Sequence, residues 1–224
     1  MRAEVLSDSW LPPRLRCREG KVEELLMALE ESREAVIVGP SGVGKSTLVR
    51  LALLEAVVVD CSVRRTAASI GRALAAGLGL KWGGLPRLKE DLAALEPRTI
   101  VFDDYTLARR TRGLLALLGA ARSGHRVVLV VHPSARHAPG VRGPAVEMPP
   151  YSAEELFAIM EDRVIEGRLP ASEDCLWEIA RSLGYPHGPG SARLAIATLR
   201  EALKLAPGEA VAEHAKTALA LLHL

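Results

Sequence analysis

A phosphate-binding type of loop, placed between a strand and a helix, constrains this sequence more than any other feature. Residues 39–47 read GPSGVGKST and fit the pattern G-x-x-x-x-G-K-[ST]. The apolar run at residues 35–38 predicts a strand before the loop, and the run at 48–54 predicts a buried helix after it. The alternative is a glycine-rich turn that fits the pattern by chance, but such a turn would have no reason to lie between a strand and a helix. The order of strand, loop and helix therefore predicts nucleotide binding.

Each residue of this loop has a predicted role. Its backbone N–H groups curl around phosphate oxygens, Lys45 reaches the outer phosphates, and the Ser46 hydroxyl ligates magnesium. The predicted nucleotide contacts are Pro40, Ser41, Gly42, Val43, Gly44, Lys45, Ser46 and Thr47. A loop that holds phosphate without any turnover is the alternative.

Composition narrows the nucleotide and the partners. The sequence has no Asn, which excludes the guanine-reading motif N-K-x-D and favours ATP over GTP. It also has no Gln, and only 6 of its 29 basic residues are Lys, which fits a hyperthermophile and equally a GC-rich genome. A net charge of +2 gives no global attraction to nucleic acid, so any DNA contact needs a local patch or a partner.

Neither a metal cluster nor a membrane segment is expected. Cys17, Cys61 and Cys175 lie far apart and form no C-x-x-C pair, which argues against a structural zinc site. The sequence starts without a signal-peptide pattern and has no apolar run long enough to span a bilayer. We expect a soluble cytoplasmic protein with reduced thiols.

Strands and helices alternate along the first two thirds of the chain. Beyond the loop, strands are predicted at residues 57–61, 99–102 and 126–131, with helices between them at 66–78, 88–95 and 107–122. A further helix is expected from Lys21. Because the strands are continuous apolar runs, we expect an α/β fold with a parallel sheet between helices. Ligands of such sheets bind at the carboxyl ends of the strands.

The composition changes near residue 150, where we predict a domain boundary. Residues 1–150 form the predicted nucleotide-binding α/β domain, which includes an irregular, proline-containing segment near its start. Residues 151–224 show four amphipathic helices and no strand, which predicts a small all-α domain. Its first helix opens with the capping box Ser152-Ala-Glu-Glu155.

Polar residues follow two of the predicted strands. Asp103 and Asp104 fit a carboxylate that holds magnesium and a second acid that polarises the attacking water. An acidic turn is the structural alternative. Glu is the usual occupant of the second position, and Asp104 is one methylene shorter, so we predict slow turnover. His132 ends a neighbouring strand, where it either senses the γ-phosphate and orients the water or serves as a structural residue.

Several arginines are candidates for contacts with phosphate. Arg193 begins the third helix of the predicted all-α domain, and points at the nucleotide if that domain folds over it. Arg136 and Arg142 lie on a loop from which either residue could act as an arginine finger in a neighbouring subunit. The groups Arg64-Arg65 and Arg109-Arg110 with Arg112 could touch DNA phosphates. A solvated surface explains each of these arginines as well.

Several stretches together resemble the archaeal origin-recognition and cell-division-control type replication initiators, a branch of the AAA+ ATPases. Residues 10–19, WLPPRLRCRE, look like the adenine-side segment of that family, and residues 57–61 are similar to its second strand. Residues 149–156, PPYSAEEL, look like the entry to its lid domain. Residues 190–195, GSARLA, resemble its sensor-2 motif Gly-Asp-Ala-Arg. The resemblance runs from about Leu6 to the end of the sequence.

The resemblance implies an ATP switch that depends on Mg²⁺, with Arg193 coupling the lid to the γ-phosphate. It implies an adenine pocket walled by Leu11, Pro12 and Arg18, with Tyr151 a further candidate. Lys45, Asp104, His132 and Arg193 are then the predicted catalytic residues, and Ser46 and Asp103 the metal ligands. His132 stands where the family often has Asn.

The family's winged-helix DNA reader is not seen after the lid. We therefore expect a slowly hydrolysing ATPase that acts as a nucleotide-dependent switch in DNA replication or repair. Such a protein would bind double-stranded DNA weakly on its own and act through protein partners or an oligomer. A signalling-type nucleotide switch that binds a protein and not DNA is the alternative.

Overall fold

The computed structural model describes residues 2–222, which form two compact units. The sheet unit comprises residues 20–39 and 45–148, and the helical unit comprises residues 2–19, 40–44 and 149–222. The assignment of residues 1–150 and 151–224 to two domains stays a prediction. None of the helices in the described part of the chain is long and apolar enough to cross a membrane.

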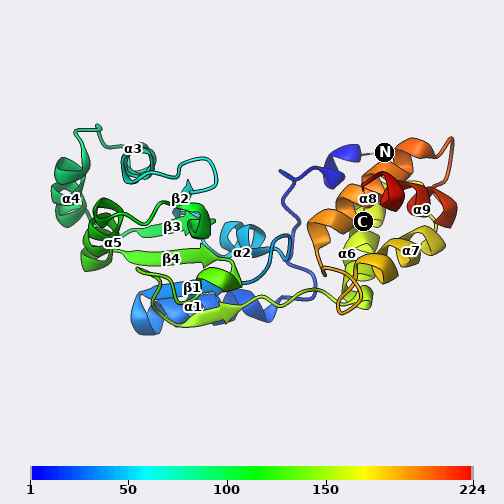
Figure 1. Ribbon diagram of the computed structural model, residues 1–224, viewed down its shortest axis with the longest axis horizontal. Coiled ribbons are helices and arrows are strands. Elements are labelled where there is room, and N and C mark those ends of the chain that lie inside the picture. Colours follow the sequence, from blue (N-terminus) through cyan, green and yellow to red (C-terminus); the bar gives the residue numbers. More distant parts are fainter. Residues whose placement is uncertain (1, 223–224) are drawn as a thin grey trace. The chain divides into compact units, whose positions relative to one another are not determined.

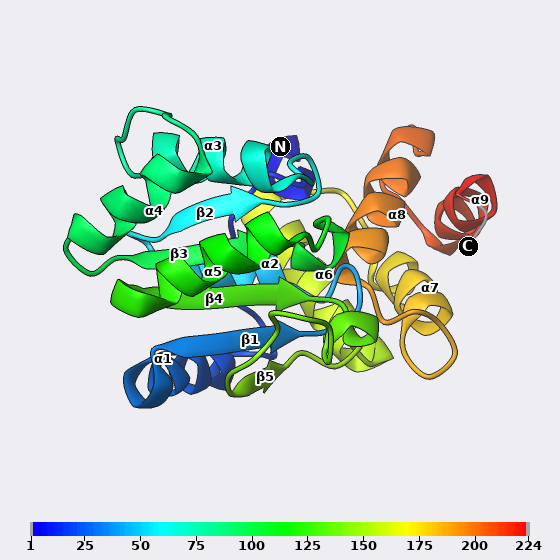
Figure 2. The ribbon, with the colours of Figure 1, turned by 60° about the vertical axis from the view of Figure 1, so that its left-hand side comes forward.

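The sheet unit is built on five strands, and all the recorded strand pairs in the described part are parallel (Figure 2). Their order across the sheet is β2-β3-β4-β1-β5. Their bounds are β1 Glu34–Val38, β2 Val57–Asp60, β3 Thr99–Asp103, β4 Arg126–Val131 and β5 Ala145–Glu147. The predicted α/β fold with a parallel sheet is therefore confirmed.

Helices lie on both faces of this sheet (Figures 1 and 2). Their bounds are α1 Gly20–Ser32, α2 Lys45–Ala52, α3 Ala67–Gly77, α4 Leu85–Ala94 and α5 Arg112–Gly124. Helices α3, α4 and α5 contact one another, and α1 packs against α2, β1 and β5. The strands β1, β3 and β4 are largely buried between these layers, which explains their continuous apolar sequences, whereas Val58 of the edge strand β2 is 46% exposed.

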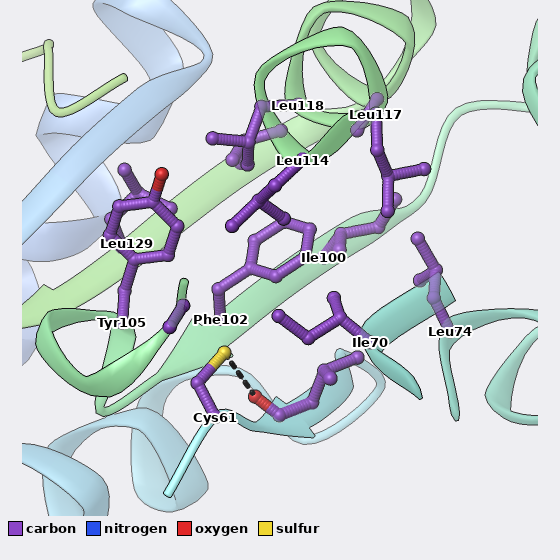
Figure 3. Packing of buried hydrophobic residues seen from close by; sticks show 14 of the residues in the cluster. Cys61, Ile70, Leu74, Ile100, Phe102, Tyr105, Leu114, Leu117, Leu118 and Leu129 are labelled. Atoms are coloured by element: carbon purple, nitrogen blue, oxygen red, sulfur yellow. Dashed lines mark hydrogen bonds between the residues drawn. The ribbon is translucent and has the colours of Figure 1, made fainter. Parts of the chain in front are cut away.

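A hydrophobic core lies between the sheet and α3, α4 and α5 (Figure 3). Every second strand residue points into it, so Ile100 and Phe102 of β3 pack with Leu114 of α5 and Ile70 of α3. The Cys61 thiol lies in the same core and donates to the Val59 carbonyl oxygen at 3.7 Å. This core fixes the ends of β2 and β3, from which several candidate site residues follow.

Two predicted helices have different starts in the structure. The helix predicted at residues 107–122 is interrupted: a 3₁₀ turn, η2 Tyr105–Leu107, comes first, and α5 begins only at Arg112, where the Thr111 side chain caps it. The helix predicted at 88–95 begins earlier, at Leu85, because Pro86 suits the first turn of a helix.

The helical unit contains four α-helices in its described part, α6 Ala153–Gly167, α7 Glu173–Leu183, α8 Ala192–Leu205 and α9 Ala212–Leu221. Ser152 and Glu155 form the predicted capping box at the start of α6. The N-terminal segment belongs to this unit, because its 3₁₀ turn η1 Ala3–Leu6 packs against α6 and α8. Val5 and Leu6 are buried there, and Arg163 of α6 donates to the Val5 carbonyl oxygen and stacks on Trp10.

Candidate functional site

The predicted phosphate loop has the backbone that its sequence requires. It runs from the end of β1 to the start of α2, with φ of +82° at Gly42 and +88° at Gly44, a region that favours glycine. Val43 is fully buried, Pro40 and Thr47 are half-buried, and Ser41 is exposed. Lys45 begins α2 and is only 8% exposed, and its Nζ donates to the Gly39 carbonyl oxygen at 2.7 Å.

The two candidate metal ligands, Ser46 and Asp103, lie next to each other. Ser46 lies in the first turn of α2 and Asp103 ends β3, and the Ser46 hydroxyl hydrogen-bonds the Asp103 carboxylate. Burial, together with the charge of Asp104, raises the pKa of Asp103, although the Ser46 hydrogen bond opposes this shift. A carboxylate and a hydroxyl in contact, one of them a poorly solvated anion, fit a hard cation such as Mg²⁺.

Asp104 follows in the left-handed region, with φ of +50°. Its side chain is exposed, and its amide donates to Asp103 Oδ1 at 3.0 Å, so the turn also fixes the preceding carboxylate. Left-handed backbone is tolerated by Asp better than by most residues. The left-handed backbone therefore gives a physical reason why residue 104 is Asp, although Glu is the usual residue at this position of an ATPase site.

His132 follows β4, the strand next to β3, as the sequence predicted. Its amide donates to Thr106 Oγ1 at 2.8 Å, which ties the ends of both strands together. The imidazole is exposed, and its Nδ1 accepts from the Ser134 amide at 3.3 Å. In this structure the ring is thus held by its own loop, and a role at the γ-phosphate stays a prediction.

Arg193 contacts the phosphate loop within the helical unit. Its amide donates to the Gly42 carbonyl oxygen at 3.4 Å, and its Nη1 donates to Ser41 Oγ at 3.3 Å. Ser191, which sequence reasoning did not single out, is 4% exposed and caps α8 by accepting from the Leu194 amide. A serine before a helix indicates a cap, but no local pattern indicates that Ser191 Oγ lies 2.0 Å from where a Cβ on Gly42 would be.

Arg18 and Tyr151, two predicted walls of the adenine pocket, contact each other. The Arg18 guanidinium lies 4.3 Å from the Tyr151 ring centroid, forms an ion pair with Glu155 and donates to the Pro149 carbonyl oxygen. Tyr151 is 1% exposed, and burial raises its pKa to about 12. The sequence identified Glu155 only as part of a capping box, because its second partner lies far away in the sequence.

The other predicted pocket wall and the two predicted arginine fingers are placed separately. Leu11 is exposed and Pro12 is half-buried. Arg142 forms a two-contact ion pair with Glu34, at the start of β1, whereas the phosphate loop follows the other end of that strand. Arg136 donates to the Gly143 carbonyl oxygen. The finger role of either arginine stays a prediction.

Comparison with solved structures identifies proteins of similar fold at low sequence identity. A Cdc6p from Pyrobaculum aerophilum has a TM-score of 0.73 and 24% identity, over 92% of this chain and 66% of that one. ORC2 of Aeropyrum pernix, solved in ADPNP-ADP complexes, has a TM-score of 0.79 and 20% identity, over 98% and 71%. A chain of Drosophila ORC bound to DNA has a TM-score of 0.78 and 19% identity, over 99% and 65%.

At these identities the likeness establishes the fold, which is that of the Cdc6 and ORC proteins. The fold expected from the initiator resemblance is therefore confirmed. The chain spans 66% of the length of the Pyrobaculum protein and 65% of that of the Drosophila chain. No protein-family model and no curated protein matches the sequence.

Proposed function

We propose that this chain is an ATP-binding switch of the AAA+ type that hydrolyses ATP slowly and acts in DNA replication or repair. The observation that carries the proposal is the contact of Arg193 with Ser41 and Gly42 of the phosphate loop. An arginine from the helical unit that contacts a phosphate loop can respond to the charge bound there. The solved ADPNP-ADP complexes of Aeropyrum pernix ORC2, a protein of the same fold, support an adenine nucleotide.

In this proposal the loop binds ATP through its own chemistry. Its backbone N–H groups and the positive end of α2 attract the phosphates, and Lys45 exchanges its bond with the Gly39 carbonyl oxygen for phosphate oxygens. Ser46 and Asp103 would hold magnesium, which would neutralise phosphate charge. Leu11, Pro12 and Arg18 are the proposed walls for adenine, with Tyr151 beneath Arg18.

Turnover in this proposal depends on Asp104. Its carboxylate accepts a proton from the attacking water, and His132 orients that water from the neighbouring strand. Because Asp is shorter than Glu, the carboxylate lies farther from the water, and the reaction is slow. Loss of the γ-phosphate then removes the negative charge to which Arg193 responds. The conformation of the helical unit that was favoured with ATP bound is then no longer favoured with ADP bound.

A second candidate function is a switch that binds a protein partner and not DNA. The left-handed, exposed Asp104 favours it, since a slow site keeps its nucleotide long enough to signal. The two functions share the nucleotide site and differ in the partner. DNA binding in the presence and absence of ATP therefore separates them.

Isothermal titration calorimetry with ATP and Mg²⁺ tests the proposed function. We expect binding by the parent, at least about tenfold weaker binding by Arg193→Ala, and no measurable heat with Lys45→Ala. Arg181→Ala is the matched control, because Arg181 is an exposed arginine elsewhere on the helical unit. Equal affinities of the parent and Lys45→Ala would refute the proposal.

A further inference from the structure

Two loops of the sheet unit bring five arginines to one surface. Arg64 and Arg65 precede α3, and Arg109, Arg110 and Arg112 lie in the segment around the start of α5. A backbone hydrogen bond joins the loops, from the Arg109 amide to the Arg65 carbonyl oxygen at 2.7 Å. The two arginine groups that the sequence presents separately are therefore neighbours.

The helices that follow these loops also touch. A Cβ added at Gly113 of α5 would lie 3.5 Å from the Ala67 Cβ of α3. The close approach of α3 and α5 fixes the spacing of the two loops, and with it the spacing of the arginines. We call Arg64, Arg65, Arg109, Arg110 and Arg112 the arginine surface.

The arginine surface lacks acidic partners. All five side chains are exposed, and none makes an ion pair with another described residue. Their own bonds are local: Arg65 Nε donates to the Ser62 carbonyl oxygen at 3.0 Å, and Arg110 Nη2 to the Thr106 carbonyl oxygen at 3.3 Å. These bonds direct the arginines without neutralising them.

The carboxylate at the end of β2 is already engaged in hydrogen bonds. Asp60 ends β2, and its Oδ1 accepts from both the Ser62 amide at 2.8 Å and the Ser62 hydroxyl at 2.6 Å. Positive charge therefore exceeds negative charge across these loops. On a chain whose net charge is only +2, this is a local concentration of unpaired guanidinium groups.

We infer that the arginine surface binds the phosphate backbone of duplex DNA without reading its sequence. Guanidinium groups match phosphate oxygens two at a time, and several side by side match an anion that repeats along a strand. Single-stranded nucleic acid is usually held by exposed aromatic rings that stack on its bases. The one aromatic residue of these loops, Tyr105, is fully buried, so the surface offers no such platform.

This inference rests on the part of the proposed function that brings the protein to DNA, and it does not need the nucleotide site. The test is fluorescence anisotropy of a short labelled duplex, and of one of its strands, over a series of salt concentrations without nucleotide. The proteins are the parent, R64A/R65A, R109A/R110A/R112A and Lys45→Ala. The control is R50A/R126A, which removes two exposed arginines of the sheet unit that lie outside the arginine surface and also make no ion pair with any residue that the structure describes.

We expect duplex binding that weakens as salt rises, with a slope of about −0.9 in log K against log salt for each phosphate contact. Each arginine-surface variant should bind at least about tenfold more weakly, and its slope should fall by about 1 for each contact removed. The control and Lys45→Ala should bind as the parent does. If Lys45→Ala still binds DNA but no longer binds ATP, the two binding activities are independent. Failure of this inference can then be distinguished from failure of the proposed nucleotide site.

The inference would be overturned by no duplex binding by the parent, by equal loss in the control and in R64A/R65A, or by tighter binding of the single strand. Stronger binding of a polyglutamate peptide than of the duplex would also overturn it and assign the surface to an acidic protein. Unchanged ATP binding and thermal unfolding of each arginine variant, and unchanged thermal unfolding of Lys45→Ala, show that these proteins are folded. The charge-preserving variant R109K/R110K/R112K should keep most of the duplex binding, which a purely structural role of these residues does not predict.

Discussion

The Ser191 hydroxyl occupies the space that a side chain at Gly42 would need. An ideal Cβ on Gly42 would lie 2.0 Å from Ser191 Oγ, closer than any real contact. The backbone at Gly42 also has a φ of +82°, which most residues with a side chain adopt only with strain. The start of α8 and the phosphate loop can therefore approach this closely only because residue 42 is glycine.

We predict that Gly42→Ala weakens ATP binding at least about tenfold, because a left-handed alanine costs about 1–2 kcal/mol before the contact with Ser191 is counted. Calorimetry measures this loss. Gly119→Ala is the control: Gly119 is exposed on α5 with no atom near its would-be Cβ, so alanine there should raise stability by up to about 1 kcal/mol. An unchanged affinity in Gly42→Ala would contradict the geometry.

The Asp104→Glu variant should hydrolyse ATP faster than the parent, by roughly tenfold or more, because the longer side chain brings the carboxylate nearer to the water. The same change should lower stability by about 1 kcal/mol or less, since Glu tolerates the left-handed backbone less well than Asp. Phosphate release under single-turnover conditions measures the rate. Asp104→Asn, which has nearly the same shape and no base, should be slower than the parent, and equal rates would remove Asp104 from the reaction.

Arg18 should matter more to stability than Arg14, although both form ion pairs with acids of α6. Arg18 is buried against Tyr151 and paired with Glu155, so Arg18→Ala should lower the free energy of unfolding by about 2–3 kcal/mol. Arg14 is exposed and pairs with Asp162 at 3.3 Å, and its loss should cost about 1 kcal/mol or less. Urea denaturation compares the two variants. Similar losses would mean that burial of Arg18 adds nothing.

The buried phenol of Tyr151 should make the free energy of unfolding fall at alkaline pH. Its pKa is raised by burial to about 12, whereas an exposed tyrosine titrates near about 10. The folded protein therefore favours the neutral phenol, and this contribution is complete below about pH 10 and lost as the pH rises from about 10 to 12. Tyr151→Phe cannot ionise, so its urea midpoint should fall less steeply over that range. Parallel curves for the two proteins would refute the assignment.

The three thiols should react in a fixed order. Cys61 and Cys175 are fully buried, and burial raises their pKa values to about 12 and about 11. Cys17 is half-buried, and burial raises its pKa as well. With Ellman's reagent we expect one slowly reacting thiol in the native protein and three in urea. Cys17→Ser should abolish the native reaction, and a fast reaction of Cys61 would mean that the core beneath β2 opens.

Local patterns were sufficient to predict most of the strands and helices. Apolar runs predicted the strands, and the glycine pattern predicted the loop, because both depend on neighbouring residues alone. The break before α5 was missed because it depends on the bond from the Arg109 amide to the Arg65 carbonyl oxygen, across two loops. The contact of Ser191 with Gly42 and the pair of Arg18 with Glu155 were missed for the same reason. Such contacts are set by tertiary packing and leave no periodicity in the sequence.

The packing of η1 against α6 and α8 joins segments that the ribosome synthesises at different times. Residues 2–19 are synthesised before the sheet unit, and the helices that bury Val5 and Leu6 are synthesised after it. At usual rates of translation this interval is on the order of ten seconds. Val5 and Leu6 must therefore stay in water while the sheet unit is made, and the helical unit can assemble only after α6 and α8 have been synthesised.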